Sequence, residues 1–132
     1  MNDAVRTGGC ACGQLTFRTR GEPRRVGLCH CMTCRKISGS PFGAFVMFQV
    51  DQVNVDGRFE SWPAGDTPRC FCPTCRSRVF SLTDDEFEIG LGAFDEPNLF
   101  EPAYELWTVR REHWLKTDGL VAYPGNRGEG SP

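Results

Sequence analysis

The chain has 132 residues, of which 39% are hydrophobic and 24% are charged. This length suits one domain, and the ordinary balance of apolar and charged residues excludes wholesale disorder and fibrous repeats. The formal net charge is -2, with charges of both signs scattered along the chain, so the sequence offers no basic surface for nucleic acid.

Strand signals dominate the chain. Residues 14–20 alternate, with Leu15 and Phe17 on one face and Thr16 and Arg18 on the other, as in a half-buried strand. A run that is apolar on both faces, residues 42–50, predicts a central strand. The remaining predicted strands cover residues 53–55, 58–62, 78–82, 87–91 and 104–109, with turns at residues 51–52, 56–57, 84–85 and 96–98.

Helical periodicity is weak throughout. The best candidate is a turn or two at residues 32–37, too short to be stable without tertiary contacts. We therefore expect a mainly β fold of short antiparallel strands with little helix, in one domain spanning residues 1–132. Its core covers about residues 8–124, followed by a loose polar tail at residues 125–132.

The N-terminal residues lack the basic start and apolar run of a signal peptide, and no segment approaches the roughly 20 apolar residues of a membrane span. We therefore expect a cytoplasmic protein that does not contact a membrane. In such a reducing compartment clustered thiols bind metal more often than each other. Nothing in the sequence indicates an oligomeric state.

Eight cysteines are the most unusual feature of the composition. They form three groups: Cys10 and Cys12; Cys29, Cys31 and Cys34; Cys70, Cys72 and Cys75. Thiolates that share a tetrahedral zinc ion lie about 3.8 Å apart, because each Zn–S bond is about 2.3 Å long. Tight turns supply that spacing, so metal binding is favoured over the alternative of disulfide bonds.

Two close pairs, Cys10 with Cys12 and Cys72 with Cys75, match a four-thiolate structural zinc site. Such a site would tie the N-terminal hairpin to a distal one and stabilise the fold. The middle group, Cys29, Cys31 and Cys34, offers one ion three ligands. Catalytic zinc sites have three protein ligands and a fourth position for water or substrate, and thiolates favour zinc over magnesium or calcium.

Three motifs resemble the glutathione-dependent formaldehyde-activating enzyme family, which includes the centromere protein V domain. The motifs are Gly-Gly-Cys-Ala-Cys-Gly at 8–13, Cys-His-Cys-Met-Thr-Cys-Arg-Lys at 29–36 and Arg-Cys-Phe-Cys-Pro-Thr-Cys at 69–75, and the segment 105–115 adds to the likeness. The resemblance covers about residues 8–124. It implies an Mss4-like, mainly β zinc-binding fold with two zinc ions.

The resemblance also implies a role for each ion. The structural zinc maps onto Cys10, Cys12, Cys72 and Cys75, and the catalytic zinc onto Cys29, Cys31 and Cys34. The implied reaction is that of a carbon–sulfur lyase, an S-(hydroxymethyl)glutathione synthase, which adds glutathione to formaldehyde. Two alternatives stay open: a zinc-stabilised binding module without catalysis, and a lyase that acts on another thiol adduct.

Two residues depart from the family pattern. Arg76 stands where the family usually has glycine, so it puts a side chain where the zinc knuckle prefers a left-handed residue, at about 1 kcal/mol of strain. Cys70 is an additional thiol. It is a buried hydrophobe, a reactive thiol, or a fourth ligand that closes the middle site.

Other polar and aromatic residues have two interpretations each. Arg35 and Lys36 attract substrate carboxylates or only face solvent, and His30 moves protons, hydrogen-bonds beside the metal ligands or points away. Ser38 and Ser40 are expected to be turn residues, and His113 has no chemical partners in the sequence. The tryptophans are expected in the core or in a cleft wall: Trp62, Trp107 and Trp114.

Overall fold

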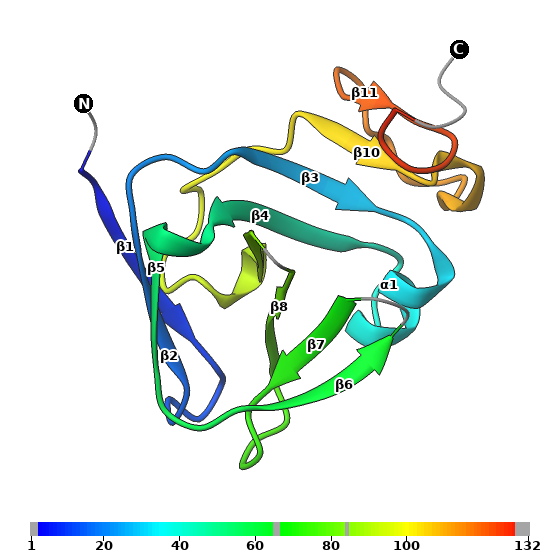
Figure 1. The fold of residues 1–132 in the computed structure, drawn as a ribbon. Helices are drawn as coiled ribbons and strands as arrows, with labels where there is room; N and C mark the ends of the chain where they lie inside the picture. The colour runs from blue at the N-terminus through cyan, green and yellow to red at the C-terminus, as the bar shows by residue number, and fades with distance from the viewer. Residues whose placement is uncertain (1–2, 65–66, 84, 129–132) are drawn as a thin grey trace.

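A computed structural model describes residues 3–64, 67–83 and 85–128, and Figure 1 shows its fold. The strands are β1 (Val5–Gly9), β2 (Thr16–Arg20), β3 (Arg25–Cys29), β4 (Gly43–Gln49), β5 (Val53–Asp56), β6 (Glu60–Ala64), β7 (Thr67–Phe71), β8 (Arg78–Leu82), β9 (Glu86–Gly90), β10 (Tyr104–Leu106) and β11 (Val121–Ala122). The helix is α1 (Met32–Ser38), and short 3-10 turns follow at Val50–Gln52, Leu91–Ala93 and Thr108–Arg110.

The strands form two sheets. A small sheet has the order β1-β2-β5, and a large one has the order β11-β10-β3-β4-β9-β8-β7-β6. Most neighbours pair antiparallel, as predicted, but β10 pairs parallel with both β3 and β11. The prediction of a mainly β fold with little helix is confirmed. In Figure 1 the small sheet lies on one side, and α1 lies on the opposite side, next to the start of β4.

The patterned segments fold as predicted. In β2 buried and exposed residues alternate, and Phe17 is buried among the core residues. The doubly apolar run becomes β4, which lies between β3 and β9 and is therefore a central strand. The predicted helix is α1, whose C-terminus closes at Gly39 in the left-handed conformation (φ 66°).

One strand is shorter than predicted. The segment expected to run from 104 to 109 ends as β10 at Leu106, because Trp107 takes a left-handed conformation (φ 57°) and starts a 3-10 turn. Trp107 donates through its backbone N–H to Gly125 O (3.0 Å) and through Nε1–H to Asn126 Oδ1 (2.9 Å). These contacts hold the start of the segment predicted to be a loose tail. Residues 129–132 of that tail lie outside the described part of the chain, and so does Asp84 of the turn predicted at 84–85.

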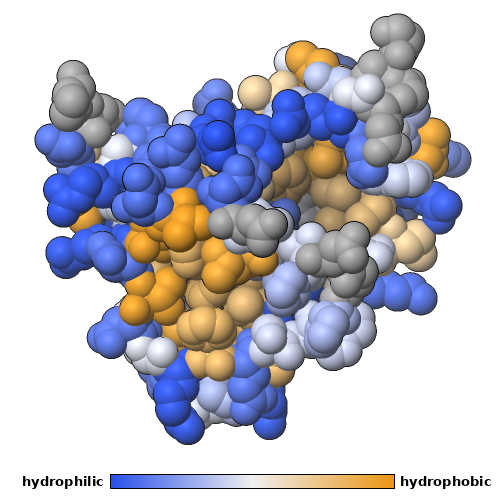
Figure 2. All heavy atoms as spheres, viewed as in Figure 1, coloured by the Kyte–Doolittle hydropathy of each residue, from blue (hydrophilic) through white to orange (hydrophobic). Residues whose placement is uncertain are grey.

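Two clusters of buried residues form the core. The larger one contains buried residues of both sheets: Phe17 and Val53 of the small sheet, and Val46, Phe48, Val79, Phe80 and Ile89 of the large one. The smaller one joins Cys29, Phe45, Met47 and Tyr104, with Trp107 packed against it. In Figure 2 apolar residues gather at the centre of the viewed face, within a hydrophilic rim.

Trp62 and Trp114 do not belong to this core. Their exposed fractions are 56% and 64%, so of the two expected places, the core or a cleft wall, the core is wrong for both; an isolated aromatic residue carries no signal of burial. No helix in the described residues is long and apolar enough to span a membrane.

Candidate functional site

The first cysteine cluster joins two turns that are far apart in the sequence. Cys10 and Cys12 follow β1, whereas Cys72 and Cys75 lie in the turn between β7 and β8. All four Sγ atoms lie within 4.8 Å of one another. The Sγ atoms of Cys10 and Cys12 are 3.6 Å apart, and those of Cys12 and Cys72 are 3.8 Å apart. These separations match the edge of a zinc–thiolate tetrahedron, about 3.8 Å, so the donor set fits a zinc ion.

Backbone amides point at these sulfurs. The N–H groups of Thr74 and Cys75 donate to Cys72 Sγ at 3.3 and 3.5 Å, and the Gln14 side-chain amide donates to the same atom at 3.2 Å. Burial raises the pKa of Cys72, but these hydrogen bonds outweigh it and lower that pKa to about 7. The Ser77 hydroxyl lies 3.2 Å from Cys75 Sγ and lowers the pKa of Cys75 to about 5. The turn thus stabilises thiolates, the form in which cysteine binds metal.

Arg76 closes this turn in the left-handed region, with φ 69°, as the sequence predicted. Its backbone N–H donates to Cys72 O at 2.9 Å, which completes the knuckle. The side chain is 69% exposed, and its Nη1 lies 3.8 Å from Glu60 Oε1. Since an exposed pair of this kind contributes little, the knuckle is held by its backbone bonds and its sulfurs despite the strained residue.

The second cysteine cluster is built around the N-terminus of α1. Cys29 ends β3, Cys31 is the N-cap residue of α1, and Cys34 lies in the first turn of the helix. The Cys34 N–H donates to Cys31 Sγ at 3.3 Å. All three Sγ atoms lie within 4.8 Å of one another, so a strand end and a helix cap bring three donors to one point.

The three cysteines of this cluster have very different pKa values. Hydrogen bonds from Cys29 and Cys34 lower the pKa of Cys31 to about 2, while the same contacts raise the pKa of Cys29 to about 11 and raise the pKa of Cys34 strongly. The protein groups alone therefore favour one thiolate and two thiols, because like charges this close repel. A divalent cation between the three sulfurs would offset this repulsion, so that all three could be thiolates. Thiolates are soft ligands, and among the common divalent ions they favour zinc.

Cys70 lies outside both clusters. It is 3% exposed, pairs in register with Ser61 and Phe80, and belongs to the larger core cluster. Burial raises the pKa of its thiol. Of the three interpretations left open by the sequence, the structure supports that of a buried hydrophobe, and among the described residues the three-sulfur group does not include Cys70.

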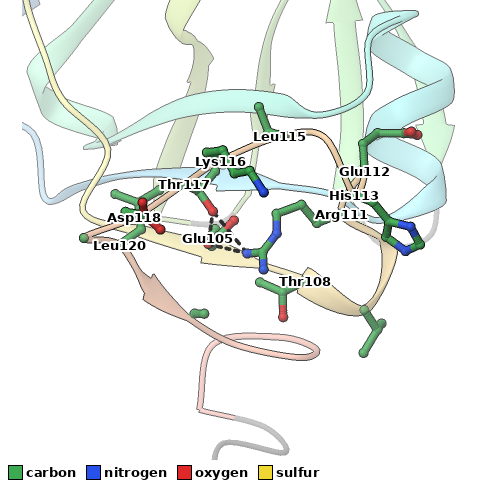
Figure 3. A pocket seen from close by; sticks show the side chains of 13 residues that line it. Glu105, Thr108, Arg111, Glu112, His113, Leu115, Lys116, Thr117, Asp118 and Leu120 are labelled. Carbon is green, nitrogen blue, oxygen red and sulfur yellow. Dashed lines mark hydrogen bonds and ion pairs between the residues drawn. The ribbon is translucent and has the colours of Figure 1, made fainter.

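A buried polar network lies directly beside the three-sulfur cluster. His30 and Glu105 are 0% and 1% exposed, and His30 Nε2 lies 2.8 Å from Glu105 Oε1. Arg111 Nη1 and Thr117 Oγ1 donate to Glu105 Oε2 at 2.8 and 2.7 Å (Figure 3). Burial raises the pKa of Glu105, but the hydrogen bonds from Thr117, His30 and Arg111 outweigh it and lower that pKa. Glu105 was not among the site residues predicted from the sequence, although a carboxylate between Tyr104 and Leu106 in a predicted strand is a signal that could have identified it.

The residues after the third cysteine are largely engaged in local contacts. Arg35 pairs with Glu112 at 2.8 Å and donates to Pro41 O at 3.2 Å. The Ser38 hydroxyl donates to Cys34 O at 2.8 Å, and Ser40 Oγ accepts from the Phe42 N–H at 3.4 Å, so both serines act in the turn that ends α1, as predicted. Lys36 is exposed.

Within the described residues, cavities adjoin these groups. One of about 590 Å³ is lined by Glu105, Arg111, His113 and Lys116 among others (Figure 3). A larger one, about 880 Å³, is lined by Cys10 of the first cluster, Ile37 of α1, Arg76 and Arg78 among others. A small cavity of about 30 Å³ adjoins Cys34.

Comparisons with known proteins agree with this arrangement. The chain is 28% identical over 74 residues to an uncharacterized lyase of Schizosaccharomyces pombe; that match spans 55% of this chain and 54% of the relative. A crystal structure of a Rhodobacter sphaeroides protein has the same fold, with a TM-score of 0.59 at 16% identity over 89% of this chain and 98% of the other. The sequence model of one family matches residues 5–110, which hold both cysteine clusters. The chain therefore belongs to the glutathione-dependent formaldehyde-activating enzyme family.

Proposed function

We propose that the protein is a zinc-dependent carbon–sulfur lyase that joins a small thiol, such as glutathione, to a small aldehyde. The observation that carries this proposal is the contrast between the two cysteine clusters. Cys10, Cys12, Cys72 and Cys75 supply four sulfurs and would hold a structural zinc, whereas Cys29, Cys31 and Cys34 supply three and would hold a catalytic one. The printed name of the Schizosaccharomyces pombe relative, a lyase, supports the reaction class.

The residues around the three-sulfur cluster have distinct tasks in this proposal. Zinc bound there would supply a ready thiolate, since coordination deprotonates a thiol at neutral pH. The buried contact between His30 and Glu105 fixes the backbone at His30, which lies between the ligands Cys29 and Cys31. The large cavity, whose wall includes Ile37 and Ser38 of α1, gives a peptide-sized thiol room, and Arg76 and Arg78 on its wall offer positive charge to the carboxylates of that thiol.

The reaction balances without a further reactant. The thiol loses its proton, its sulfur forms a bond to the carbonyl carbon, and the carbonyl oxygen takes up a proton to become a hydroxyl group. Orientation of the two reactants is the main contribution expected from such a site. We further propose that the described core acts as one domain, in a reducing compartment such as the cytoplasm, because free thiols and zinc thiolates persist there.

The test combines metal analysis with spectroscopy of cobalt-substituted protein. We expect two ions per chain, and we expect glutathione at millimolar concentration to change the thiolate charge-transfer band of the three-sulfur site. If glutathione leaves the charge-transfer band unchanged and four cysteine sulfurs already bind that ion, the enzyme proposal is wrong and a zinc-stabilised binding module is favoured.

Two variants form a matched pair for this test. Cys34→Ser removes a proposed ligand and is expected to abolish both the second ion and the glutathione response. Cys70→Ser changes a thiol of the core and is expected to leave the metal content at two ions. Loss of one ion in Cys70→Ser would make Cys70 a ligand and contradict the assignment.

A further inference from the structure

The segment that follows β10 is tied to the three-sulfur cluster. In the parallel pairing of β10 with β3, Leu106 is the partner of Cys29, and the His30 N–H continues this pairing by donating to Leu106 O at 3.0 Å. The match to the family model ends at residue 110, so it does not extend to the residues that come after. Two of those residues, Arg111 and Thr117, reach back to Glu105 on β10 (Figure 3).

Both carboxylate oxygens of Glu105 are bound. Oε1 lies 2.8 Å from His30 Nε2, whereas Oε2 accepts from Arg111 Nη1 and Thr117 Oγ1 at 2.8 and 2.7 Å. Arg111 Nη1 also donates to Thr117 Oγ1 at 3.1 Å, so the two residues brace each other. A carboxylate that faces a guanidinium is charged and only accepts hydrogen bonds, so the His30 ring carries its hydrogen on Nε2.

His30 stands at the bend that brings two of the clustered sulfurs together. Residues two apart in a straight strand are separated by about 6.5 Å, whereas thiolates on one zinc ion are about 3.8 Å apart. The chain bends at His30, because β3 ends at Cys29 and α1 begins directly after Cys31. Two contacts hold this one residue: its backbone N–H binds Leu106 O, and its ring binds Glu105.

The orientation of the His30 ring depends on Glu105, and Glu105 depends on Arg111. The ring is fully buried, and its Nδ1 has no hydrogen-bond partner within the described residues. Arg111 supplies the positive charge that compensates the buried carboxylate. Without it the buried charge is strongly unfavourable, so the carboxylate would turn toward solvent in the cavity of about 590 Å³ that it lines, and away from His30.

We propose that Arg111 and Thr117 are positioning residues for the three-sulfur cluster. They hold Glu105, Glu105 holds His30, and the backbone at His30 sets how closely the sulfurs on either side of it approach. The C-terminal segment thereby controls the affinity and the ligand geometry of this metal site. The inference rests on the proposed function, because it concerns the ion that the three sulfurs would hold, and it adds the residues that shape the site from outside.

The two cysteine clusters allow a test within one molecule. The NMR resonance of ¹¹³Cd²⁺, a soft ion that binds thiolates, depends on the number and arrangement of the sulfurs around it, so each cluster should give its own signal. The four-sulfur cluster, built by the turns after β1 and between β7 and β8, is the internal reference. Arg111→Ala should shift or broaden the three-sulfur signal and leave the reference signal in place.

Metal affinity gives a second readout. In Arg111→Ala we expect the affinity of the three-sulfur site for Zn²⁺, measured by competition with a chelator, to fall about 10-fold or more, the usual cost of losing a group that orients a metal ligand. Thr117 provides a milder pair of variants. Thr117→Val keeps the shape but removes the hydroxyl, and should move the same signal by a smaller amount; Thr117→Ser keeps the hydroxyl and should match the wild type.

Arg25→Ala is the matched control for a general loss of stability. Arg25 lies on β3, the strand that ends at Cys29, and its Nη2 lies 2.8 Å from Glu86 Oε1. Its side chain is 27% exposed and that of Arg111 is 34% exposed, so the two variants remove comparable ion pairs. Arg25→Ala should leave both ¹¹³Cd signals in place. Equal shifts of the three-sulfur signal in Arg25→Ala and Arg111→Ala would overturn the positioning role.

The cavity beside Arg111 permits a chemical rescue. Glu105, Arg111 and Thr117 all line it, so guanidinium ion has room to take the place of the deleted side chain in Arg111→Ala. Guanidinium chloride at millimolar concentration, far below denaturing concentrations, should return the three-sulfur signal toward that of the wild type. Equal recovery with sodium chloride would mean that ionic strength acts on the site, and would contradict the role of a placed cation.

The wild type separates this inference from the proposed function. If Arg111→Ala moves the three-sulfur signal and glutathione leaves the wild-type signal unchanged, the positioning role stands and the enzyme proposal is wrong. If glutathione acts on the wild type while Arg111→Ala and Thr117→Val both leave the three-sulfur signal in place, the positioning role is wrong and the enzyme proposal stands.

Discussion

The buried pair of His30 and Glu105 yields the sharpest prediction on stability. We consider Glu105→Gln, which keeps the shape of the side chain and removes its charge. The matched control is Glu112→Gln, because Glu112 forms an ion pair with Arg35 at 2.8 Å, the same distance that separates Glu105 from Arg111. Glu105 is 1% exposed and Glu112 is 33% exposed, and Glu105 also faces Thr117 and His30, so the two carboxylates differ in burial and in the donors around them.

The expected loss follows from the donors that face Glu105. If the amide oxygen introduced by Glu105→Gln accepts from Arg111 and Thr117, the new NH₂ group faces His30 Nε2, which must then give up its hydrogen. The hydrogen moves to Nδ1, which is buried and has no partner among the described residues. His30 Nδ1 lacks a partner in the wild type as well, so the loss comes from the charge of Glu105: a hydrogen bond to a charged group is worth about 1.5–3 kcal/mol and one between neutral groups about 0.5–1.5 kcal/mol, a difference of about 1 kcal/mol for each of the donors that face Glu105. We therefore expect Glu105→Gln to lower the free energy of unfolding by about 3 kcal/mol.

Urea denaturation of the zinc-loaded protein, followed by tryptophan fluorescence at pH 7, measures this change. A loss of about 3 kcal/mol corresponds to a fall in Tm of about 12 °C at this chain length. Glu112→Gln should change the free energy of unfolding by at most about 1 kcal/mol, since partly exposed ion pairs contribute little. Equal losses in the two variants, or a loss under about 1 kcal/mol in Glu105→Gln, would refute the argument from burial.

Three further predictions follow from single features. Arg76→Gly should raise the free energy of unfolding by about 0.5–1 kcal/mol and Arg76→Ala should not, because only glycine relieves the strain at φ 69°; thermal melts decide this. Glu86 has a lowered pKa, since its bonds to Arg25 outweigh the effect of burial. Its contribution to stability is therefore present above the unfolded pKa of about 4.3 and lost as the pH falls through the lower folded pKa, so urea midpoints of wild type and Glu86→Gln should converge in acid. Cys72→Ser should lose one zinc ion and lower the Tm more than Cys34→Ser, because its cluster closes a chain loop of 60 residues; equal Tm losses would contradict this.

One strand that the sequence did not predict, β3, has a clear physical cause. In β3, Gly27 sits in the middle of a short segment, and glycine normally weakens a strand. The structure explains it: a Cβ at Gly27 would meet the Tyr104 ring at 2.7 Å and the Phe45 ring at 3.0 Å. The aromatic residues of β4 and β10 require glycine on the strand between them, and only the tertiary neighbours reveal that requirement.

The sequence by itself determined the features that depend on local geometry. The spacing of the cysteines predicted their division into a group of four, a group of three and a single thiol. The alternation of apolar and polar residues predicted β2, and the position of Arg76 directly after Cys75 predicted its left-handed conformation. Each of these is decided within a few bonds, because a turn or a strand imposes its own distances on the side chains it carries.

Only the tertiary structure decided what depends on distant segments. The burial of Cys70, the contact between His30 and Glu105, 75 residues apart, and the narrow cavity between Cys34 and Arg78 all arise where β3, β4 and β7–β10 pair. Local sequence patterns do not encode these long-range contacts, because strand order and register determine which side chains are neighbours across a sheet. The eight cysteines indicated where chemistry is possible, and the sheet determined which polar groups and which volume stand beside it.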